Sequence, residues 1–284
     1  MKRKNFLNKY FFLTSIGYIP VTIWIVFIFV LVGWVVFASL STSAEIYSDH
    51  MFEFRSGFHF ENFVRAWSAQ RVSTIFLNSL IYCSISCVAL ALISCPAAYV
   101  LSRFKFRGNT IIQNMFAAAL GIPIIMIVMP LFSLATSFKL VNNRVLLILL
   151  YIGIYVPFGV FFMLAFFKNL SHSYEESAAI DGCTQIRTFW NIMFPLAQPG
   201  LVTLTVFNFI AIWNEFFISL IFGNRPAVRP VSLGLYNMIQ SMRYTSDWGG
   251  MFASVVIVFL PTFVLYVFLS DKIIKGVTAG AIKG

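Results

Sequence analysis

Six apolar stretches of membrane-spanning length divide this sequence and limit what it can fold into. They run over residues 16–40, 74–100, 111–137, 145–167, 201–222 and 250–270. A spanning helix needs about 20 mostly apolar residues, which each stretch supplies. All twenty Lys and Arg residues lie outside these stretches, as the hydrocarbon interior of a bilayer requires. We therefore predict an all-α polytopic membrane protein with six transmembrane helices.

Composition supports this class and bears on the choice of partners. The chain is 60% hydrophobic and 11% charged, whereas soluble domains carry roughly 25% charged residues. A net charge of +10 is compatible with a nucleic-acid partner. The basic residues, however, lie between apolar stretches and form no basic face, so we interpret them as topology signals and expect no nucleic acid.

The N-terminal basic cluster and the first apolar stretch resemble a secretory signal peptide. The stretch is nevertheless too long for such a signal, and no small-residue cleavage site precedes a soluble domain. We predict that it is retained as the first transmembrane helix. Its basic residues are Lys2, Arg3, Lys4 and Lys9.

The distribution of Lys and Arg predicts the orientation, because cytoplasmic loops are enriched in both. Twelve lie in the N-terminal segment, the second and fourth connections and the tail, and eight are spread over the other, longer connections. This predicts a cytoplasmic N-terminus at 1–15 and a cytoplasmic tail at 271–284. Residues 41–73 are then extracytoplasmic, and 74–270 form a five-helix core.

The extracytoplasmic segment contains the stretch FENFVRAW, which has the apolar spacing of an amphipathic helix. Two interpretations stay open, a docking surface and a helix lying in the membrane interface. The apolar positions are Phe60, Phe63, Val64 and Trp67.

Cysteine and histidine positions indicate no metal site and no disulfide framework. Three cysteines fall in one apolar stretch and one in a polar connection, and no histidine lies at ligand spacing from another ligand type. We expect the cysteines to act as small buried hydrophobic residues. The positions are Cys83, Cys87, Cys95 and Cys183, with His50, His59 and His172.

Residues 172–200 form the long polar connection between the fourth and fifth apolar stretches. Ser173 followed by Glu176 fits a capping box, which predicts a helix from Tyr174. The helix is expected to run to Asp181 and to stop at Gly182, a residue suited to a left-handed conformation.

A second amphipathic helix is predicted to follow this turn, with Thr184 as its N-cap. Its apolar face has helical spacing, and two prolines end it. The face comprises Ile186, Phe189, Trp190 and Met193, and the prolines are Pro195 and Pro199.

This segment resembles the EAA loop of the permeases of ATP-binding-cassette importers. That pattern is Glu-Ala-Ala, a Gly four residues later, and after nine more residues Ile-x-Leu-Pro. Here it reads Glu176-Ser177-Ala178, Gly182 and Ile192-Met193-Phe194-Pro195, with the spacing intact. Ser177 and Phe194 depart from the pattern, and the proline usual before the loop is absent from 170–174.

The resemblance extends over nearly the whole chain and narrows to carbohydrate importer permeases of the maltose-transporter type. The stretches that carry it are Phe76-Leu77-Asn78-Ser79-Leu80, Ala98-Tyr99, Arg103-Phe104-Lys105-Phe106-Arg107-Gly108, Trp213-Asn214-Glu215 and Gly280-Ala281-Ile282-Lys283-Gly284.

The resemblance implies that the loop couples this chain to a separate cytoplasmic ATPase dimer. This chain has no phosphate-binding loop, so ATP and Mg would be bound by the partner and no cofactor by this chain. It would be a transport subunit and not an enzyme. The implied coupling residues are Glu175, Glu176, Ser177, Ala178, Asp181, Gly182, Ile192 and Pro195.

The other implied partners are a second homologous permease, an extracytoplasmic solute-binding protein and a sugar. The implied location is the inner or plasma membrane of a bacterial cell. The implied activity is import of an oligosaccharide or sugar derivative.

Glu215 is the only acidic residue within the predicted apolar stretches, and such residues are functional candidates. A path or gate role and a pairing with Arg225 or Arg229 both stay open. Glu215 also leaves an ion-coupled secondary transporter as the alternative function. The candidate translocation-path residues are Asn78, Asn208, Trp213, Asn214 and Glu215.

Overall fold

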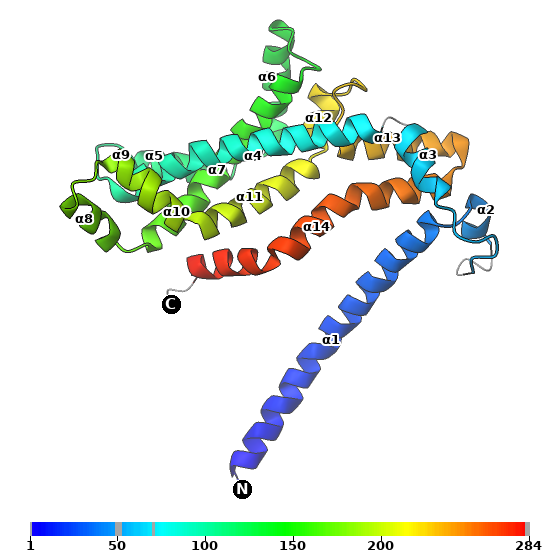
Figure 1. The fold of residues 1–284 in the computed structure, drawn as a ribbon, viewed down its shortest axis with the longest axis horizontal. Coiled ribbons are helices and arrows are strands. Elements are labelled where there is room, and N and C mark those ends of the chain that lie inside the picture. The colour runs from blue at the N-terminus through cyan, green and yellow to red at the C-terminus, as the bar shows by residue number, and fades with distance from the viewer. Residues whose placement is uncertain (1, 49–52, 70–71, 282–284) are drawn as a thin grey trace. The chain divides into compact units, whose positions relative to one another are not determined.

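The computed structural model describes residues 2–48, 53–69 and 72–281, and in these ranges the regular elements are helices (Figure 1). His50 and residues 282–284 of the C-terminal motif lie outside them. The elements are α1 (Lys2–Ser39), α2 (Ser43–Ile46), α3 (Glu61–Ala69), α4 (Val72–Arg103), α5 (Asn109–Ala119), α6 (Ile124–Ser137), α7 (Arg144–Asn169), α8 (Ser173–Ile180), α9 (Gln185–Thr188), the π-helical turn η1 (Phe189–Met193), α10 (Phe194–Leu196), α11 (Gln198–Trp213), α12 (Phe217–Phe222), α13 (Val231–Thr245) and α14 (Trp248–Ala281).

Four of the predicted transmembrane helices are present as single helices. The portions that are long and apolar enough to cross a membrane are Gly17–Ser39 in α1, Val72–Arg103, Arg144–Asn169 and Trp248–Phe268 in α14. Counting each of two bent helix pairs as one span raises the number to six. The prediction of a polytopic all-α membrane protein is confirmed.

The third predicted span, 111–137, is not one continuous helix. It consists of α5 and α6, which are bent by 96° at a short break. Pro123 stands immediately before α6 in an extended conformation, and a proline disfavours helical geometry in the residue before it. Apolar composition alone could not reveal this break.

The fifth predicted span, 201–222, is also interrupted. Helix α11 ends at Trp213, and the short α12 begins only at Phe217. At its other end α11 is bent by 70° from the helix Gln185–Leu196. Pro199 lies in the first turn of α11, where the missing N–H of a proline is tolerated.

The chain forms two compact units. One comprises Met1–Gln70 with Met238–Ile257, and the other comprises Arg71–Asn237 with Val258–Gly284.

In the first unit, polar side chains fix the segment that follows α1. The buried Asn62 amide donates to the carbonyls of Ser39 and Ser41, at 2.9 Å each. Helix α3 confirms the helix predicted within 60–67, and Asn62 lies on its buried face. Of the predicted apolar positions, Phe60, Val64 and Trp67 are exposed, with Val64 at 69%, and Phe63 is half-buried. A docking surface and a membrane-interface helix both stay open.

The Glu45 carboxylate is the shared acceptor of a second polar cluster in the first unit. Its carboxylate accepts hydrogen bonds from the backbone and hydroxyl of Thr42, at 2.9 and 3.0 Å, and from those of Ser56, at 3.0 and 2.7 Å. The bonds from Thr42 and Ser56 stabilise the carboxylate and lower the pKa of Glu45 to about 2.

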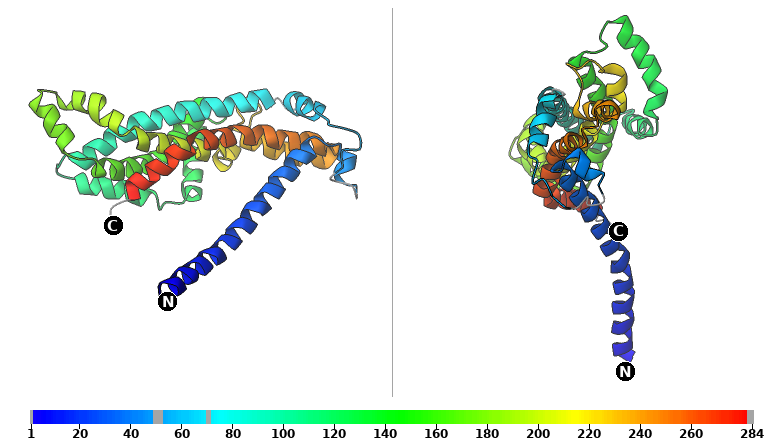
Figure 2. Two further views of the ribbon diagram at one scale, coloured as in Figure 1. Left: turned by 60° about the horizontal axis from the view of Figure 1, so that its bottom comes forward. Right: turned by 90° about the vertical axis from the view of Figure 1, so that its right-hand side faces the viewer.

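In the second unit, α4, α7 and α11 pack side by side and form the core (Figures 1 and 2). Gly159 of α7 lies against Ser94 of α4, and a Cβ at Gly159 would come within 2.4 Å of the Ser94 hydroxyl. Glycine at this position therefore allows the two long helices to approach closely. Helices α8 and α9 lie at the end of the bundle where α4 ends, and α12 lies toward its other end (Figure 1).

Polar residues of α4 hold the segment between α12 and α13. The Asn78 amide donates to the carbonyls of Ala227 and Arg229, at 3.0 Å each. The Tyr82 hydroxyl donates to the Val228 carbonyl at 2.6 Å. Asn78, a candidate path residue, is thus a buried residue that positions this connection.

Candidate functional site: the loop at 172–200 and the turn after α11

Helix α8 begins one residue earlier than predicted and without the predicted capping box. Its N-cap is His172, which makes no side-chain cap hydrogen bond. The Ser171 hydroxyl instead accepts a hydrogen bond from the backbone N–H of Ser173 at 3.2 Å. Ser173 lies inside the helix and cannot act as its cap, so the predicted pairing with Glu176 is wrong.

The end of α8 confirms the predicted glycine turn. Gly182 has a φ of +72°, a conformation that glycine adopts without steric cost. The N–H of Cys183 donates to the Ala178 carbonyl at 2.9 Å, and the N–H of Gly182 donates to the Ala179 carbonyl at 3.1 Å. These two bonds form a Schellman motif and satisfy carbonyls that the helix end leaves free.

The helix after the turn has its predicted cap but not its predicted single apolar face. The Thr184 hydroxyl accepts from the N–H of Arg187 at 3.4 Å. Phe189 is buried, whereas Ile186 is 74% exposed. The predicted face is therefore divided between a buried and an exposed side of the helix, and the π-helical turn η1 begins at Phe189.

The remaining predicted members of this second helix follow the same division. Met193 is buried and Trp190 is exposed. Ile192 is half-buried and packs against the core around Tyr99 and Phe167. Pro195 is exposed and stands in the short α10, so the helix passes through it and ends at Leu196.

The side chain of Arg103, at the end of α4, contacts residues at the start of the loop. Its Nε lies 3.1 Å from Glu175 Oε1, and its side chain is 3% exposed. One guanidinium nitrogen donates to the Leu170 carbonyl at 2.8 Å, and the other lies 3.0 Å from His172 Nε2. His172 Nδ1 lies 3.3 Å from Glu175 Oε2. A buried cation thus joins α4 to α8.

The face of α8 opposite Arg103 is exposed. Glu176, Ser177 and Asp181 are exposed, and the Glu176 carboxylate has no partner among the described residues. Ile180 is 87% exposed. Ala178 is buried and points inward. The helix therefore offers an acidic and apolar surface.

Arg103 was predicted as a basic residue that indicates topology and as part of a stretch that carries the family resemblance, but not as a partner of the loop. It lies seventy-two positions before Glu175, and no local pattern encodes that pairing.

Glu215 caps α12 and makes no ion pair with Arg225 or Arg229 in the described structure. Its carboxylate accepts from the N–H groups of Ile218 at 2.6 Å and Ser219 at 3.1 Å. It also accepts from the Tyr151 hydroxyl of α7 at 3.3 Å. Through these bonds the carboxylate fixes the turn after α11, and its predicted role in a path or gate stays a prediction.

The other candidate path residues have different surroundings. Trp213 is buried, stacks on Phe209 with ring centroids 5.5 Å apart, and donates from Nε1 to the Val258 carbonyl at 3.2 Å. Asn214 is exposed, and its amide donates to the Ile210 carbonyl at 2.8 Å. Both lie at the end of α11.

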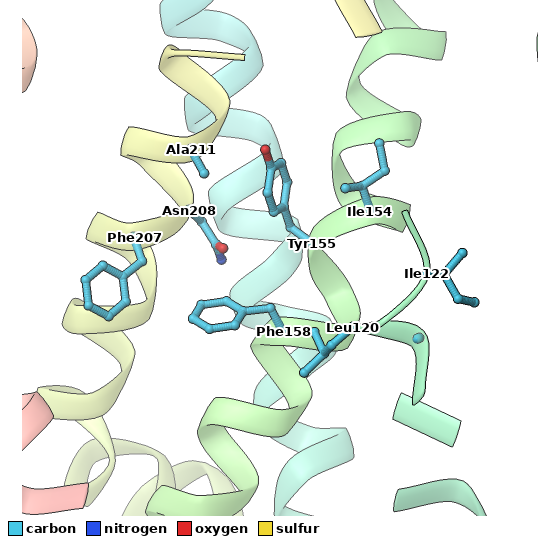
Figure 3. Close-up of a pocket in the computed structure, with 9 residues that line it drawn as sticks. Leu120, Ile122, Ile154, Tyr155, Phe158, Phe207, Asn208 and Ala211 are labelled. Atoms are coloured by element: carbon cyan, nitrogen blue, oxygen red, sulfur yellow. The ribbon is translucent and has the colours of Figure 1, made fainter. Parts of the chain in front are cut away.

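Asn208 is the one predicted path residue that lines a cavity among those described. The cavity has a volume of about 400 Å³ and lies between α11, α7 and the break between α5 and α6 (Figure 3). Glu215 lies beyond the end of α11, so the two residues do not share a helix face as predicted.

No three His, Cys, Asp or Glu side chains in the described ranges are grouped as metal ligands would be. Cys83, Cys87 and Cys95 are buried in α4, and Cys183 is half-buried in the turn after α8.

Comparison with known proteins identifies the family. Residues 90–277 match the family described as "Binding-protein-dependent transport system inner membrane component". The diacetylchitobiose uptake system permease protein NgcG of Streptomyces coelicolor is 31% identical over 269 residues, which cover 95% of this chain and 89% of that protein. The trehalose/maltose transport system permease protein MalG of Thermococcus litoralis is 30% identical over 253 residues, covering 88% and 90%.

A solved structure shares the fold. It is that of a bacterial ABC transporter involved in the import of the acidic polysaccharide alginate, and it matches with a TM-score of 0.78 at 20% identity. The match covers 90% of this chain and 95% of that chain.

These matches agree with the prediction of a multi-pass membrane protein that is a transport subunit and not an enzyme. The family match extends from the middle of α4 to within α14 and includes both the loop at 172–200 and the turn after α11. The chain belongs to the family of inner membrane components of binding-protein-dependent transport systems.

Proposed function

We propose that this chain is a permease subunit of an ATP-driven importer and forms half of the pathway for an oligosaccharide or sugar derivative. The family match and the sugar-transport names of its relatives support this. The structural observation that carries the proposal is the two-sided character of α8. One face is held by the buried Arg103, and the other is exposed with an unpaired carboxylate.

In this proposal α8 docks into a partner ATPase and transmits its movement to α4. Glu176 is the outward carboxylate and pairs with a basic residue of the ATPase, while Ser177 and Ile180 supply contact surface. Glu175 faces inward to Arg103 and serves as an anchor. A buried guanidinium with several partners holds its geometry. A displacement of α8 by the ATPase therefore displaces α4 as well.

The remaining partners follow from the same proposal. The chain pairs with a second, homologous permease and works with an extracytoplasmic solute-binding protein. It lies in the inner or plasma membrane of a bacterial cell, with both termini cytoplasmic, as the distribution of Lys and Arg predicts. ATP and Mg are bound by the ATPase dimer, and this chain binds no cofactor.

The test is uptake by the complex reconstituted in proteoliposomes with a binding protein. ATP is expected to drive uptake of a labelled sugar, and disabling the nucleotide site of the ATPase is expected to abolish it. Uptake driven by a proton or sodium gradient in the absence of ATP would overturn the proposal and restore the ion-coupled alternative.

A further inference from the structure

A groove lies between the end of α4 and the segment formed by α9 and η1, which are neighbours in Figure 1. It has a volume of about 340 Å³, and its lining residues all belong to the second unit. The buried rings of Tyr99 and Phe189 form its base, with centroids 5.0 Å apart. Val100 on one side is exposed, and so are Ile186 and Trp190 on the other. The groove is therefore open to the surroundings of the chain.

The lining of the groove selects an apolar occupant. The described residues that line it include no Asp, Glu, Lys or Arg, and aliphatic and aromatic side chains predominate. Apolar surface of this kind is stabilised when it is covered by other apolar groups. The groove also lies at the end of the candidate membrane span Val72–Arg103. Hydrocarbon chains of lipids are therefore the apolar groups that surround it.

An exposed apolar stripe on α4 leads into the groove. Its members follow one another at intervals of three or four residues, so they lie along one side of the helix. The next positions at this spacing are Pro96 and Val100, which line the groove. A hydrocarbon chain that lies along the stripe thus enters the groove at the end of the span. The exposed members are Leu77, Ile81, Ile85, Val88 and Leu92.

Basic residues flank the groove on both sides. Lys105 follows the lining residue Phe104, and Arg187 follows the lining residue Ile186. Both basic side chains are exposed, and adjacent Cα atoms are only 3.8 Å apart. Lys and Arg next to the end of a membrane span attract anionic lipid headgroups.

Two further observations agree with a headgroup at this level. Trp190 is 44% exposed at the side of the groove, and tryptophan is enriched at the boundary between hydrocarbon and water. The exposed acidic residues of the neighbouring α8, Glu176 and Asp181, do not line the groove. The groove thus combines an apolar interior with a positively charged margin.

We propose that this groove binds an anionic phospholipid, with an acyl chain between Val100 and Trp190 and the phosphate group on Lys105 and Arg187. A free phosphate ion would leave the apolar sides uncovered, whereas a phospholipid satisfies both parts of the site. Because α9 follows α8 in the chain, the bound lipid also joins α4 to the segment after the loop. The inference goes beyond the proposed function and does not depend on it.

The experiment measures quenching of Trp190 fluorescence in the complete reconstituted complex. The vesicles are phosphatidylcholine with a small fraction of lipid that is brominated on an acyl chain. The contribution of Trp190 is the difference between the unsubstituted complex and Trp190→Phe. Brominated phosphatidylglycerol is expected to reach half-maximal quenching at about fivefold lower bilayer fraction than brominated phosphatidylcholine, the factor that one basic residue near an anionic lipid supplies.

Charge variants test the margin of the groove. The double substitution Lys105→Gln with Arg187→Gln is expected to reduce the preference for phosphatidylglycerol to less than about twofold. Arg225→Gln is the matched control, because Arg225 is also exposed but lies in the connection between α12 and α13. It is expected to leave the preference unchanged.

A second pair of variants tests the interior. Val100→Phe adds a ring inside the groove and is expected to weaken quenching by both brominated lipids. Val88→Phe makes the same change at an exposed position of α4 that does not line the groove. It is expected to leave quenching of Trp190 unchanged.

Three results would overturn the proposal. Equal quenching by the two brominated lipids would show that the groove faces the bilayer without selecting a headgroup. Absence of quenching by either lipid would show that another protein of the complex covers the groove. A preference for phosphatidylglycerol that persists in the double variant would show that Lys105 and Arg187 do not hold the phosphate. Each of these results leaves the proposed function standing, because none of them measures uptake.

Discussion

The loop at α8 and the turn after α11 both carry glutamates that a sequence marks as functional candidates, but the fold uses them differently. Glu215 accepts hydrogen bonds from two backbone N–H groups and a tyrosine hydroxyl. Glu175 pairs with a buried arginine, and its neighbour Glu176 is exposed without a partner. A carboxylate whose bonding capacity is used within the chain holds structure, and one left outward is available to a partner.

Removal of the Glu215 carboxylate is expected to have the largest effect on stability. Glu215→Ala leaves the N–H groups of Ile218 and Ser219 without their acceptor, and this is expected to lower the free energy of unfolding by about 2–4 kcal/mol. Unfolding in mixed detergent micelles, followed by circular dichroism, measures the change. Glu176→Gln serves as the control and is expected to leave stability unchanged. Equal changes in the free energy of unfolding for Glu215→Ala and Glu176→Gln would contradict the different roles of the two carboxylates.

Loss of the Arg103 side chain is expected to disconnect α8 from α4. Arg103→Ala removes the contacts with Leu170, His172 and Glu175 at once, so ATP-driven uptake is expected to fall by about tenfold or more while the ATPase still binds. Arg103→Lys is expected to restore little of it, because an ammonium lacks the planar fork of a guanidinium. Full uptake in Arg103→Ala would show that the contacts of Arg103 do not transmit the movement of α8 to α4.

Gly182 offers a smaller and purely conformational test. No atom lies within 4 Å of the position that a Cβ would occupy, so Gly182→Ala meets only the cost of a positive φ. That cost is about 1 kcal/mol, and faster backbone amide exchange at Cys183 is expected to report it. Gly57→Ala, at a φ of +91° with equally open space, is the matched control in the first unit. Unchanged exchange at Cys183 would contradict the left-handed turn.

Glu45 gives the mildest prediction and extends the comparison to the first unit. Its folded pKa, about 2, is below its ordinary value of 4.5, so the ionised form stabilises the folded segment. This stabilisation is complete above the ordinary pKa and is lost as the pH falls from 4.5 toward 2. Protection of the Ser56 amide against hydrogen exchange is expected to weaken over that interval, and Glu45→Gln is expected to abolish the pH dependence. The same dependence in Glu45→Gln would assign it to another group.

The sequence predicted features that depend on local chemistry. Hydropathy located the apolar spans, because a bilayer requires about 20 apolar residues in succession. The left-handed turn at Gly182 and the cap at Thr184 were predicted because each depends on one residue type at a helix end.

Features that depend on distant residues were not predictable in this way. The pairing of Arg103 with Glu175 joins two helices far apart in the chain, and the inward direction of Glu175 follows from it. The end of α11 at Trp213 lies within an apolar run, so hydropathy does not indicate it. The cavity at Asn208 requires three parts of the chain to meet. The family resemblance indicated that the loop carries function, and the acidic residue within an apolar stretch marked the end of α11 as a candidate.

The central claim is that the outward face of α8 receives the movement of the ATPase, and Glu176→Lys tests it most directly. Uptake of a labelled sugar and co-purification of the ATPase are measured on the same reconstituted complex, with the thermal stability of the isolated permease as reference. The account predicts that reversal of this exposed charge abolishes uptake and weakens ATPase association while stability stays unchanged. Unchanged association and uptake in Glu176→Lys would contradict it.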